Sequence, residues 1–440
     1  MVLPSNKSRH FVVFANICRL VLALVLVLSG FLKAVDPVGG VYKLQEYASL
    51  FSLSGISGDW LLAAAVAQSA AEFLLGLFLL VGVYRGIVTF MALIAMILLA
   101  PLSLYVWVSG ALNDCGCFGE SIVMSNGVTF AKNVFLLLFA FVAFWGRSFF
   151  ICRMSRKTRW ALVFFAVAYI FTMQAVAVTH LPLLDSGDYT VGSNLRSKVE
   201  YIPDEYEYKA VYYKKNGGEA SEPFIVDADT VMGVEWEFDG YTEVLVALGT
   251  EPEIGNFSIL DWDRDIEFAD ELLADTGYVC IVAIEDVATA SVTHIDKIND
   301  LYDYCVANGI RFCAVSASYG DEILQWTKRT GAEYTVYWGG QAMLRSMLHA
   351  NPGLLLLKDG VVVGKWAAAD IPAVDGDVAS QLFADTASLK PIMEPWKFCA
   401  VMLLCVTGVL ALIDASIVGI GRSRRKKSAG DYETSDYELI

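Results

Sequence analysis

Two cysteines separated by one glycine, Cys115-Gly116-Cys117, are the residues of this chain best suited to chemistry. They lie in the segment N-D-C-G-C-F-G-E at Asn113–Glu120. Glycine supplies the backbone freedom that closing so small a disulfide ring requires. Such a ring is strained and therefore oxidising and labile, and it removes little chain entropy. The spacing favours thiol–disulfide exchange; the alternative is a locally convenient disulfide or a pair of idle thiols.

Three charged residues accompany the cysteines in or beside apolar runs, where an ionisable group is a functional hypothesis by default. At 1.5 Å per residue, Arg19 and Glu72 lie about 12 Å and about 18 Å from the same end of a helical bundle. We predict an intramembrane ion pair between them, with an architectural role favoured over a catalytic one. Lys33 emerges at the end that carries the cysteines, where an ammonium would lower a thiol pKa. The alternative for Lys33 is a snorkelling interfacial lysine.

The elements that must position these residues are membrane-spanning helices. The chain is 56% hydrophobic, against roughly 45–50% for a soluble protein. Six apolar runs are long enough to span a bilayer, which takes about 20 residues. These runs are Phe11–Phe31, Trp60–Tyr84, Gly86–Val108, Val128–Trp145, Trp160–His180 and Trp396–Ile420. A helix over Val38–Leu53 is expected to lie on the outer surface or to cap the bundle.

Charge predicts the orientation. Basic residues cluster before the first span, in the loop 147–159 and after the last span, so we place both termini in the cytoplasm. Asp185–Glu394 holds 37 acidic and 14 basic residues and falls outside. We therefore expect a multi-pass protein of a bacterial inner membrane with a large periplasmic domain. An acidic domain argues against nucleic-acid binding, and the four histidines show no metal-ligand spacing, so no metal is assigned.

The outer segment has two parts. Residues 189–249 contain alternating stretches typical of short β-strands. After residue 254 the pattern becomes strand–helix alternation, a βαβ unit followed by a hairpin and a terminal helix. The expected strands are Tyr278–Ile284, Ile310–Ser316, Gly353–Lys358 and Val361–Trp366; the expected helices are Asp263–Ala274, Val292–Asn308, Asp321–Gly331, Gln341–His349 and Val378–Ala387.

The fold class expected is thus an α-helical membrane bundle, four core helices plus two further spans, with an α/β outer domain. We divide the chain into a four-helix membrane domain (1–150), a fifth span (151–184), a β-rich segment (185–252), an α/β domain (253–390), a sixth span (391–421) and a basic then acidic tail (422–440).

The membrane part resembles the DoxX/MauE family. The residues that carry this resemblance are Arg19, Ser29-Gly30-Phe31, Lys33, Asp36-Pro37, Glu72 in A-A-E-F-L-L-G and the C-G-C-F-G motif, which points to the MauE branch. The family is associated with methylamine utilisation, where it assists maturation of a disulfide-rich subunit beside a thioredoxin-like partner. The bundle is also similar to four-helix membrane thiol oxidoreductases that pass electrons to quinone. The resemblance implies a redox role for Cys115 and Cys117 and a membrane quinone as acceptor; the residues alone indicate no cofactor.

The outer domain resembles the thioredoxin fold. Asn351-Pro352-Gly353 stands where that fold has the cis-proline that opens the strand before its hairpin. The expected Cys-x-x-Cys is absent, because the segment after Tyr278–Ile284 reads E-D-V-A-T-A-S. We therefore interpret the domain as a degenerate binder whose Asn351, Pro352 and Gly353 form the docking surface. Cys280, Cys305 and Cys313 are interpreted as buried small hydrophobes.

Two functional hypotheses follow. The first is a membrane thiol–disulfide or electron-transfer component, MauE-like, that uses Cys115 and Cys117 to assist maturation of an extracytoplasmic protein partner. The second is a non-enzymatic, membrane-anchored binding or assembly protein whose thioredoxin-like domain docks a partner. A small-molecule transporter is disfavoured, because the chain shows no inverted repeat or paired interrupted helices.

Overall fold

The structure, a computed structural model, describes residues 6–53, 55–120, 122–150, 155–184, 187–214, 223–262 and 264–372. Three predictions lie outside these residues: the helix Val378–Ala387, the sixth span Trp396–Ile420 and the tail 422–440.

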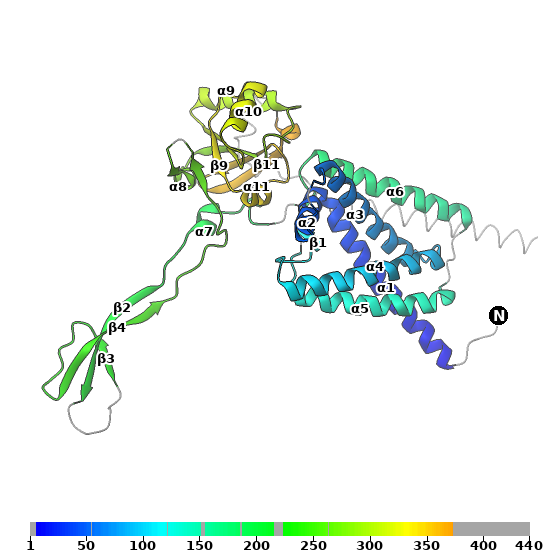
Figure 1. Cartoon of the computed structure of the whole chain (residues 1–440), viewed down its shortest axis with the longest axis horizontal. Helices are drawn as coiled ribbons and strands as arrows, with labels where there is room; N and C mark the ends of the chain where they lie inside the picture. Colours follow the sequence, from blue (N-terminus) through cyan, green and yellow to red (C-terminus); the bar gives the residue numbers. More distant parts are fainter. Residues whose placement is uncertain are drawn as a thin grey trace, which may run out of the picture.

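Five helices are long and apolar enough to cross a membrane, and they confirm the first five predicted spans. They are α1 (Asn6–Val35), α3 (Gly58–Val81), α4 (Arg85–Ser109), α5 (Asn126–Trp145) and α6 (Arg156–Thr179), and a 3₁₀ turn η1 (Gly146–Phe149) extends α5. Figure 1 shows them packed side by side as one bundle, with α1 crossing its neighbours obliquely. The chain is therefore a multi-pass membrane protein embedded in a lipid bilayer.

Helices α1 and α3 approach closely because two glycines lie at their contact. A Cβ added at Gly30 would lie 2.3 Å from the backbone nitrogen of Phe73, and one at Gly76 would lie 2.5 Å from that of Val27. Small residues at such crossings let helix backbones pack tightly within a membrane. The glycines thereby fix the register that sets which side chains of α1 and α3 face each other.

We expect Gly30→Val to separate α1 from α3 and to lower the unfolding temperature of the detergent-solubilised protein by several degrees, a cost of about 1–3 kcal/mol for overpacking. Gly86→Val is the matched control, because a Cβ there meets nothing within 4 Å. Equal unfolding temperatures for the two variants would contradict the close contact.

A shorter helix, α2 (Pro37–Leu50), and a short strand, β1 (Cys117–Glu120), lie together at one end of the bundle. Asp36 caps α2 by accepting a 2.9 Å hydrogen bond from the Gly39 backbone nitrogen, and Pro37 follows at the first helical position. This helix confirms the predicted Val38–Leu53, and it packs against α3 and β1. We call the end that carries residues 110–125 the cysteine-bearing end.

Beyond the cysteine-bearing end lies an α/β region with a mixed seven-stranded sheet (Figure 1), which confirms the predicted fold class. The strand order is β11-β10-β7-β8-β9-β5-β6, with β7, β8 and β9 parallel. Its elements are β5 (Ile259–Asp261), β6 (Ile266–Glu267), α8 (Ala269–Ala274), β7 (Tyr278–Ile284), α9 (Ile295–Asn308), β8 (Arg311–Ser316), α10 (Asp321–Thr330), β9 (Val336–Gly339), α11 (Gln341–Met347), β10 (Gly353–Lys358), β11 (Val361–Ala367) and η2 (Ala368–Asp370).

The two faces of this sheet carry separate cores. Alternate residues of β7 enter each core, with Ile281 on one side and Val282 on the other. Helices α8 and α11 cover the first side, whereas α9 and α10 cover the second. Burial on both sides explains why β7 reads as a continuous apolar run.

The four expected strands are confirmed to within one residue. The expected helix Asp263–Ala274 is wrong in its first half, because β6 occupies Ile266–Glu267 and α8 begins only at Ala269. The expected βαβ unit also lacked β9, a four-residue strand between α10 and α11. Its sequence V-Y-W-G is too short to show a period of its own.

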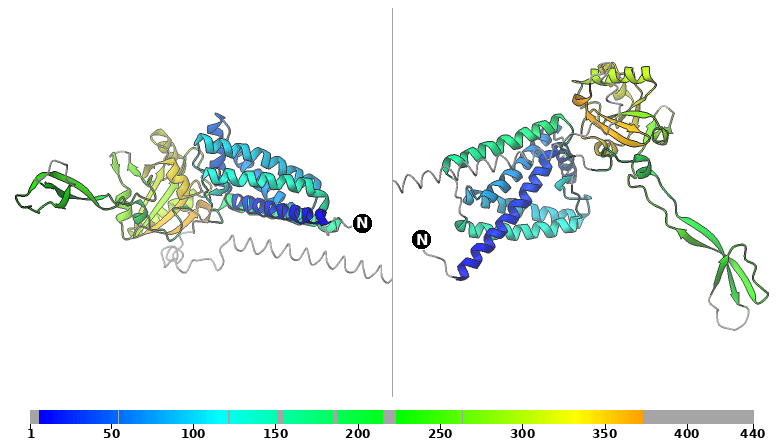
Figure 2. Two further views of the ribbon diagram at one scale, coloured as in Figure 1. Left: turned by 90° about the horizontal axis from the view of Figure 1, so that it is seen from below. Right: turned by 180° about the vertical axis from the view of Figure 1, so that it is seen from behind.

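The β-rich segment forms a three-stranded antiparallel sheet with strand order β3-β2-β4, which we call the arm. It follows the short helix α7 (Leu195–Val199) and comprises β2 (Glu205–Lys214), β3 (Phe224–Asp227) and β4 (Trp236–Ala247). All views place the arm on the far side of the α/β region from the bundle (Figures 1 and 2).

Candidate redox site

Cys115 and Cys117 lie side by side as free thiols, with 3.8 Å between their sulfur atoms. Gly116 between them has φ +63°, and a Cβ there would lie 3.1 Å from two side-chain carbons of Lys43. The backbone nitrogen of Gly116 donates to Asp114 Oδ2 at 2.8 Å. Both the backbone angle and the space require glycine at this position.

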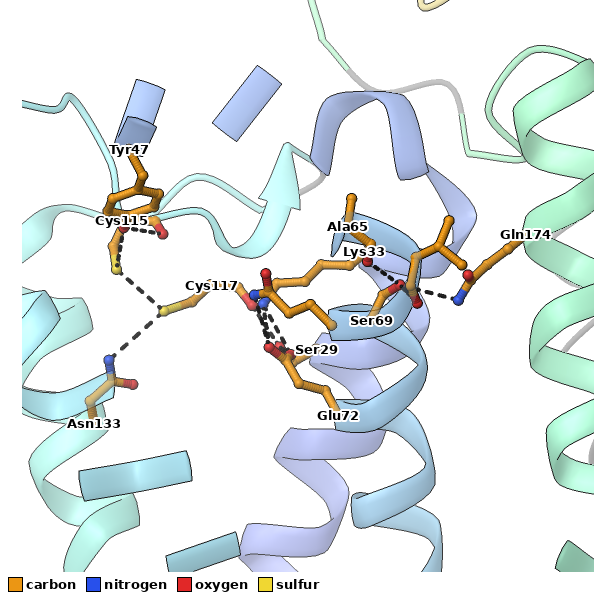
Figure 3. A network of polar contacts seen from close by, with 12 residues as sticks. Ser29, Lys33, Tyr47, Ala65, Ser69, Glu72, Cys115, Cys117, Asn133 and Gln174 are labelled. Atoms are coloured by element: carbon orange, nitrogen blue, oxygen red, sulfur yellow. Dashed lines mark hydrogen bonds and ion pairs between the residues drawn. The ribbon is translucent and has the colours of Figure 1, made fainter. Parts of the chain in front are cut away.

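Helix α2 holds the Cys115 side of the pair. The Tyr47 hydroxyl donates to the Cys115 carbonyl oxygen at 3.0 Å and lies 3.3 Å from the Cys115 sulfur (Figure 3). One turn earlier, Lys43 Nζ bonds Asp114 Oδ1 at 2.6 Å. Two side chains of one helix face thus fix the loop that carries the thiols.

Helices α1 and α5 hold the Cys117 side. Asn133 Nδ2 lies 3.9 Å from the Cys117 sulfur (Figure 3), and the neighbouring Lys132 places its ammonium 4.4 Å from the ring centre of Phe118. The Ser29 hydroxyl lies 2.6 Å from the Cys117 carbonyl oxygen and 2.7 Å from Glu72 Oε2, so it can donate to either one. Cys117 is therefore connected, through Ser29, to the Glu72 carboxylate inside the bundle.

Glu72 pairs with Lys33 and not with Arg19, which corrects the ion pair predicted from the sequence. Lys33 Nζ lies 2.8 Å and 3.0 Å from the two carboxylate oxygens of Glu72, and both side chains are almost buried, at 12% and 13% exposed. The physical reason is the register set by Gly30 and Gly76, which brings Glu72 level with the cysteine-bearing end of α1.

Arg19 lies near the other end of the bundle. Its guanidinium is 4.9 Å from the ring centre of Phe150, and its Nη1 would be 2.8 Å from a Cβ at Gly82, where α3 ends. Ten residues of α3 separate Gly82 from Glu72, about 15 Å along the axis. Distances counted from the predicted helix ends could not resolve that difference.

Helix α2 also contacts the α/β region, through residues at and near its start. Asp36 Oδ2 pairs with His349 Nδ1 at 2.9 Å, with both side chains near 10% exposed. The Tyr42 hydroxyl donates to Glu285 Oε2 at 2.9 Å, and Arg345 pairs with Glu285 at 2.8 Å while covering the Tyr42 ring. Burial, followed by the Glu285 charge, raises the pKa of Tyr42. The α/β region therefore braces the helix that holds Cys115.

The predicted docking residues lie mostly inside the α/β region. Pro352 and Gly353 are buried, and the Asn351–Pro352 peptide bond is cis, as the resemblance led us to expect. The Asn351 side chain donates to the Asp286 carbonyl oxygen at 3.0 Å, while the Asn351 backbone carbonyl accepts from the Ser291 backbone nitrogen. A docking role for these three residues stays a prediction, and little of their surface is open to a partner.

The three cysteines of the α/β region, Cys280, Cys305 and Cys313, are buried. Cys280 of β7 lies 3.7 Å, sulfur to sulfur, from Cys305 of α9, whereas Cys313 of β8 belongs to the core on the opposite face of the sheet. The hydrogen bond between Cys280 and Cys305, with burial, raises the pKa of Cys280, and burial raises that of Cys313 to about 12. Thiols so protonated are poor nucleophiles at neutral pH.

A cavity of about 280 Å³ opens beneath the thiols. Its polar end is formed by both cysteines and by Lys33, Lys43, Tyr47, Glu72 and Lys132. The deeper wall comes from apolar side chains of α1, α4 and α5, namely Val25, Leu26, Met96, Leu99, Leu102 and Leu136. A thiol pair thus lies at the head of a largely apolar cavity within the bundle.

Comparison with known protein families shows which family the membrane bundle resembles. Residues 12–146 match the family model described as Methylamine utilisation protein MauE, and this match covers under a third of the chain. The membrane bundle is MauE-like. The match contains α1 to α5 with the cysteine loop, and it confirms the resemblance that the sequence motifs indicated. No curated protein matches the chain.

The two thiols of the MauE-like bundle differ in acidity. The hydrogen bond shared with Cys115 lowers the pKa of Cys117 to about 6; burial opposes this shift, and the ammonium groups of Lys132 and Lys33 reinforce it. The same hydrogen bond, with burial, raises the pKa of Cys115. Near neutral pH, Cys117 is therefore the thiolate and Cys115 the protonated partner that stabilises it.

This acidity predicts a pH profile. Because thiolate forms only above the pKa, alkylation of Cys117 by iodoacetamide should rise through about pH 6, where an ordinary thiol rises near 8.5. Lys132→Met should move the midpoint upward, since the charge is lost and much of the stem is kept. Site-resolved mass spectrometry measures the rates. Lys328→Met is the control, because Lys328 is an exposed residue of α10. A midpoint that is unchanged in Lys132→Met would contradict the assignment of Cys117 as the acidic thiol.

Sequence reasoning identified Cys115, Cys117, Lys33 and Glu72 at this site, and the structure brings all four to the cavity. It missed several residues that line the cavity or support the loop: Ser29, Lys43, Tyr47, Asp114, Lys132 and Asn133. A signal existed for three of these. Lys43 and Tyr47 are four residues apart on the predicted outer helix, and Lys132 is a charge within an apolar run.

Proposed function

We propose that this protein is a membrane thiol–disulfide component that assists maturation of extracytoplasmic proteins, with Cys115 and Cys117 as its redox pair. The observation that carries the proposal is the pair of adjacent free thiols, 3.8 Å apart, at the head of the cavity in a MauE-like bundle. The name of the matching family, methylamine utilisation, supports a role in that process.

The unequal acidity of the thiols suggests an order of bond changes. In the oxidised protein, a substrate thiolate attacks the Cys115 sulfur, and the Cys115–Cys117 bond breaks with Cys117 leaving as the thiolate, because the more acidic thiol leaves faster. A second substrate thiolate then attacks the substrate sulfur of the mixed disulfide and releases Cys115, which takes up a proton. The substrate is oxidised by two electrons, and the Cys115–Cys117 pair is reduced.

Reoxidation of the pair requires a two-electron acceptor, and we propose a membrane quinone. The cavity residues fit such a molecule, because the deep wall is apolar while ammonium groups and the Tyr47 hydroxyl can donate hydrogen bonds to ring oxygens at the polar end. Bound there, a quinone would accept two electrons as the Cys117 thiolate and the Cys115 thiol form the disulfide, with one proton from Cys115 and a second from Lys33 or solvent. Lys132 would hold Cys117 as a thiolate beside the quinone. Lys33, paired with Glu72, would hold a proton near the ring oxygens.

For the α/β region we propose a thioredoxin-like domain that has kept the fold and lost its own dithiol. The loop that follows β7, Glu285 to Ser291, contains no cysteine, and Glu285 instead binds Tyr42 of α2. Its role would be to position α2, and with it Tyr47, over Cys115. The division into a membrane domain (1–150), a β-rich segment (185–252) and this domain (253–390) is part of the proposal.

We propose that the cysteine-bearing end faces the periplasm of a bacterial inner membrane, with both termini in the cytoplasm. The loop 147–159 at the opposite end carries five basic residues, whereas residues 109–127 at the cysteine-bearing end carry none. That orientation would put the thiols and the α/β region in a compartment where disulfides persist.

A second candidate is a non-enzymatic binding or assembly protein. It is favoured by the α/β region, whose described cysteines are all buried and cannot exchange. In that case the region would dock a partner, and loss of Cys115 and Cys117 would leave the docking intact.

The test of the proposal uses the purified protein in liposomes that contain ubiquinone, with reduced ribonuclease A as the dithiol probe. We expect ribonuclease to regain its disulfides while an equivalent amount of quinone is reduced, and both to require Cys115 and Cys117. If the double Cys→Ser variant supported the same rate as the wild type, the proposal would be wrong and the binding role would stand.

A further inference from the structure

The arm presents an aromatic face that the described part of the chain leaves exposed. The register of β2 with β4 and β3 pairs Tyr212 with both Phe238 and Phe224, and Ala210 with Tyr241, so these side chains share one side of the sheet. The large side chains of this face are Tyr206, Tyr208, Tyr212, Phe224, Trp236, Phe238, Tyr241 and Leu245, and the register also places Glu243 on it, opposite Tyr208. Ring contacts at 5.1–5.5 Å join Tyr212, Phe238 and Tyr241.

The opposite side of the same sheet combines charged residues with Val211, Tyr213 and Val244. Lys209 pairs with Glu207 at 2.8 Å and with Asp227 at 2.5 Å, so its charge is satisfied within the arm. Because side chains alternate along a strand, the ion pairs of Lys209 lie on one face of the arm and most of its aromatic rings lie on the other.

The aromatic face is strongly exposed. Tyr208 is 59% exposed, Tyr241 62%, Tyr206 52% and Phe238 48%. None of these side chains belongs to a buried cluster among the described residues. A contiguous exposed patch of large apolar side chains marks a site of interaction, and aromatic residues contribute most to the affinity of such sites.

The arm is also acidic, and its charge restricts the partner. Residues 200–214 carry four acidic and two basic side chains, while residues 223–249 carry six acidic and no basic ones. The acidic charge of the arm would repel anionic lipid. The arm also lies on the far side of the α/β region from the bundle in every view (Figure 2). A second copy would bring the same acidic charge. Charge complementarity therefore selects a basic partner.

The sheet order β3-β2-β4 leaves one backbone edge of β3 and one of β4 without a ladder partner among the described strands. An extended polypeptide can add to such an edge through main-chain hydrogen bonds while its side chains meet the face of the sheet. A folded protein buries the apolar residues that this face would take up, whereas an unfolded chain exposes them.

We propose that the arm binds extended, basic segments of unfolded polypeptides, laying their apolar side chains across the aromatic face. This goes beyond the proposed redox function and does not depend on it, because no thiol takes part. An arm of this kind would hold a client protein beyond the membrane before its disulfides form.

The test uses the full-length protein in detergent and fluorescence anisotropy of labelled lysozyme that has been reduced and carboxamidomethylated, which is unfolded and basic. We expect saturable binding that weakens as salt is raised. The triple variant Tyr208→Ser, Phe238→Ser, Tyr241→Ser should lose about tenfold or more in affinity. Tyr213→Ser with Val244→Ser, on the opposite face, is the matched control and should change the affinity by less than about twofold.

A second variant keeps the proposal testable if the triple variant misfolds. Glu235→Gln, Glu237→Gln, Asp239→Asn leaves the aromatic face in place and should weaken binding of the basic probe. The proposal is overturned if neither set of changes weakens binding, or if carboxamidomethylated α-lactalbumin, which is unfolded and acidic, or native lysozyme binds equally well. Binding of anionic vesicles through the arm, or self-association that is lost in the triple variant, would also overturn it.

Discussion

Replacing either cysteine of the pair by serine should reduce dithiol oxidation to the rate of protein-free liposomes, because one thiol cannot close a disulfide. The two variants should nevertheless differ in reactivity. In Cys115→Ser, the serine hydroxyl can still donate to Cys117, which remains a thiolate near neutral pH. In Cys117→Ser, Cys115 loses the hydrogen bond that raises its pKa most, but its burial still raises the pKa.

Alkylation with iodoacetamide at pH 7 measures that difference. An ordinary thiol is only a few per cent thiolate at this pH, so Cys117 of the first variant should react at least about 30-fold faster than Cys115 of the second. Cys115→Ala is the control, because alanine removes the hydrogen bond and should slow Cys117. Equal rates for the two serine variants would contradict the assignment of Cys117 as the acidic thiol.

The second large effect concerns the ion pair inside the bundle. Glu72→Leu leaves the Lys33 ammonium almost buried without its carboxylate, and it also removes an acceptor of Ser29. Breaking one side of a buried pair costs about 3–5 kcal/mol, since the remaining charge is uncompensated. We expect the variant to unfold at distinctly lower denaturant concentration in detergent than the wild type.

Two comparisons isolate the cause. The double variant Lys33→Met, Glu72→Leu removes both charges and should recover much of the lost stability. Glu46→Leu removes the more exposed partner of Lys43 and should cost no more than about 1 kcal/mol. The interpretation fails if the double variant is less stable than Glu72→Leu alone.

The sequence predicted the elements better than their contacts. Each of the five apolar runs within the described residues forms a helix, because a 20-residue stretch of such composition has few other ways to satisfy its backbone in a membrane. Strands such as Tyr278–Ile284 were found because burial on both faces leaves an unbroken apolar run. The strand β9 was missed because four residues show no periodicity.

The candidate site shows the same division. Cys115 and Cys117 stand out by type and spacing, yet the partner of Glu72 depended on a helix register that two glycines set. Whether Arg19 or Lys33 pairs with Glu72 depends on how α1 is aligned with α3, and the two alternatives differ by about ten residues along α3. Apolar composition alone does not determine this alignment. The contact of Tyr42 with Glu285 joins residues 243 positions apart in the chain, and no local pattern encodes it.

Among the described residues, the α/β region and the cysteine loop are linked through α2. Asp36 and Tyr42, at and near the start of this helix, bind the α/β region, and Lys43 and Tyr47, further along it, bind the loop of Cys115. The proposed function thus gives the outer domain a part in the chemistry without a cysteine of its own.

The central claim is that Cys115 and Cys117 change oxidation state together. The most direct measurement is thiol trapping of this pair in native membranes, with mass spectrometry of the peptide that contains both cysteines, before and after a soluble quinone is added. We expect a dithiol after dithiothreitol treatment and removal of the reductant, and a Cys115–Cys117 disulfide once quinone is present. A pair that stays reduced with quinone, or that stays oxidised with dithiothreitol, would contradict it.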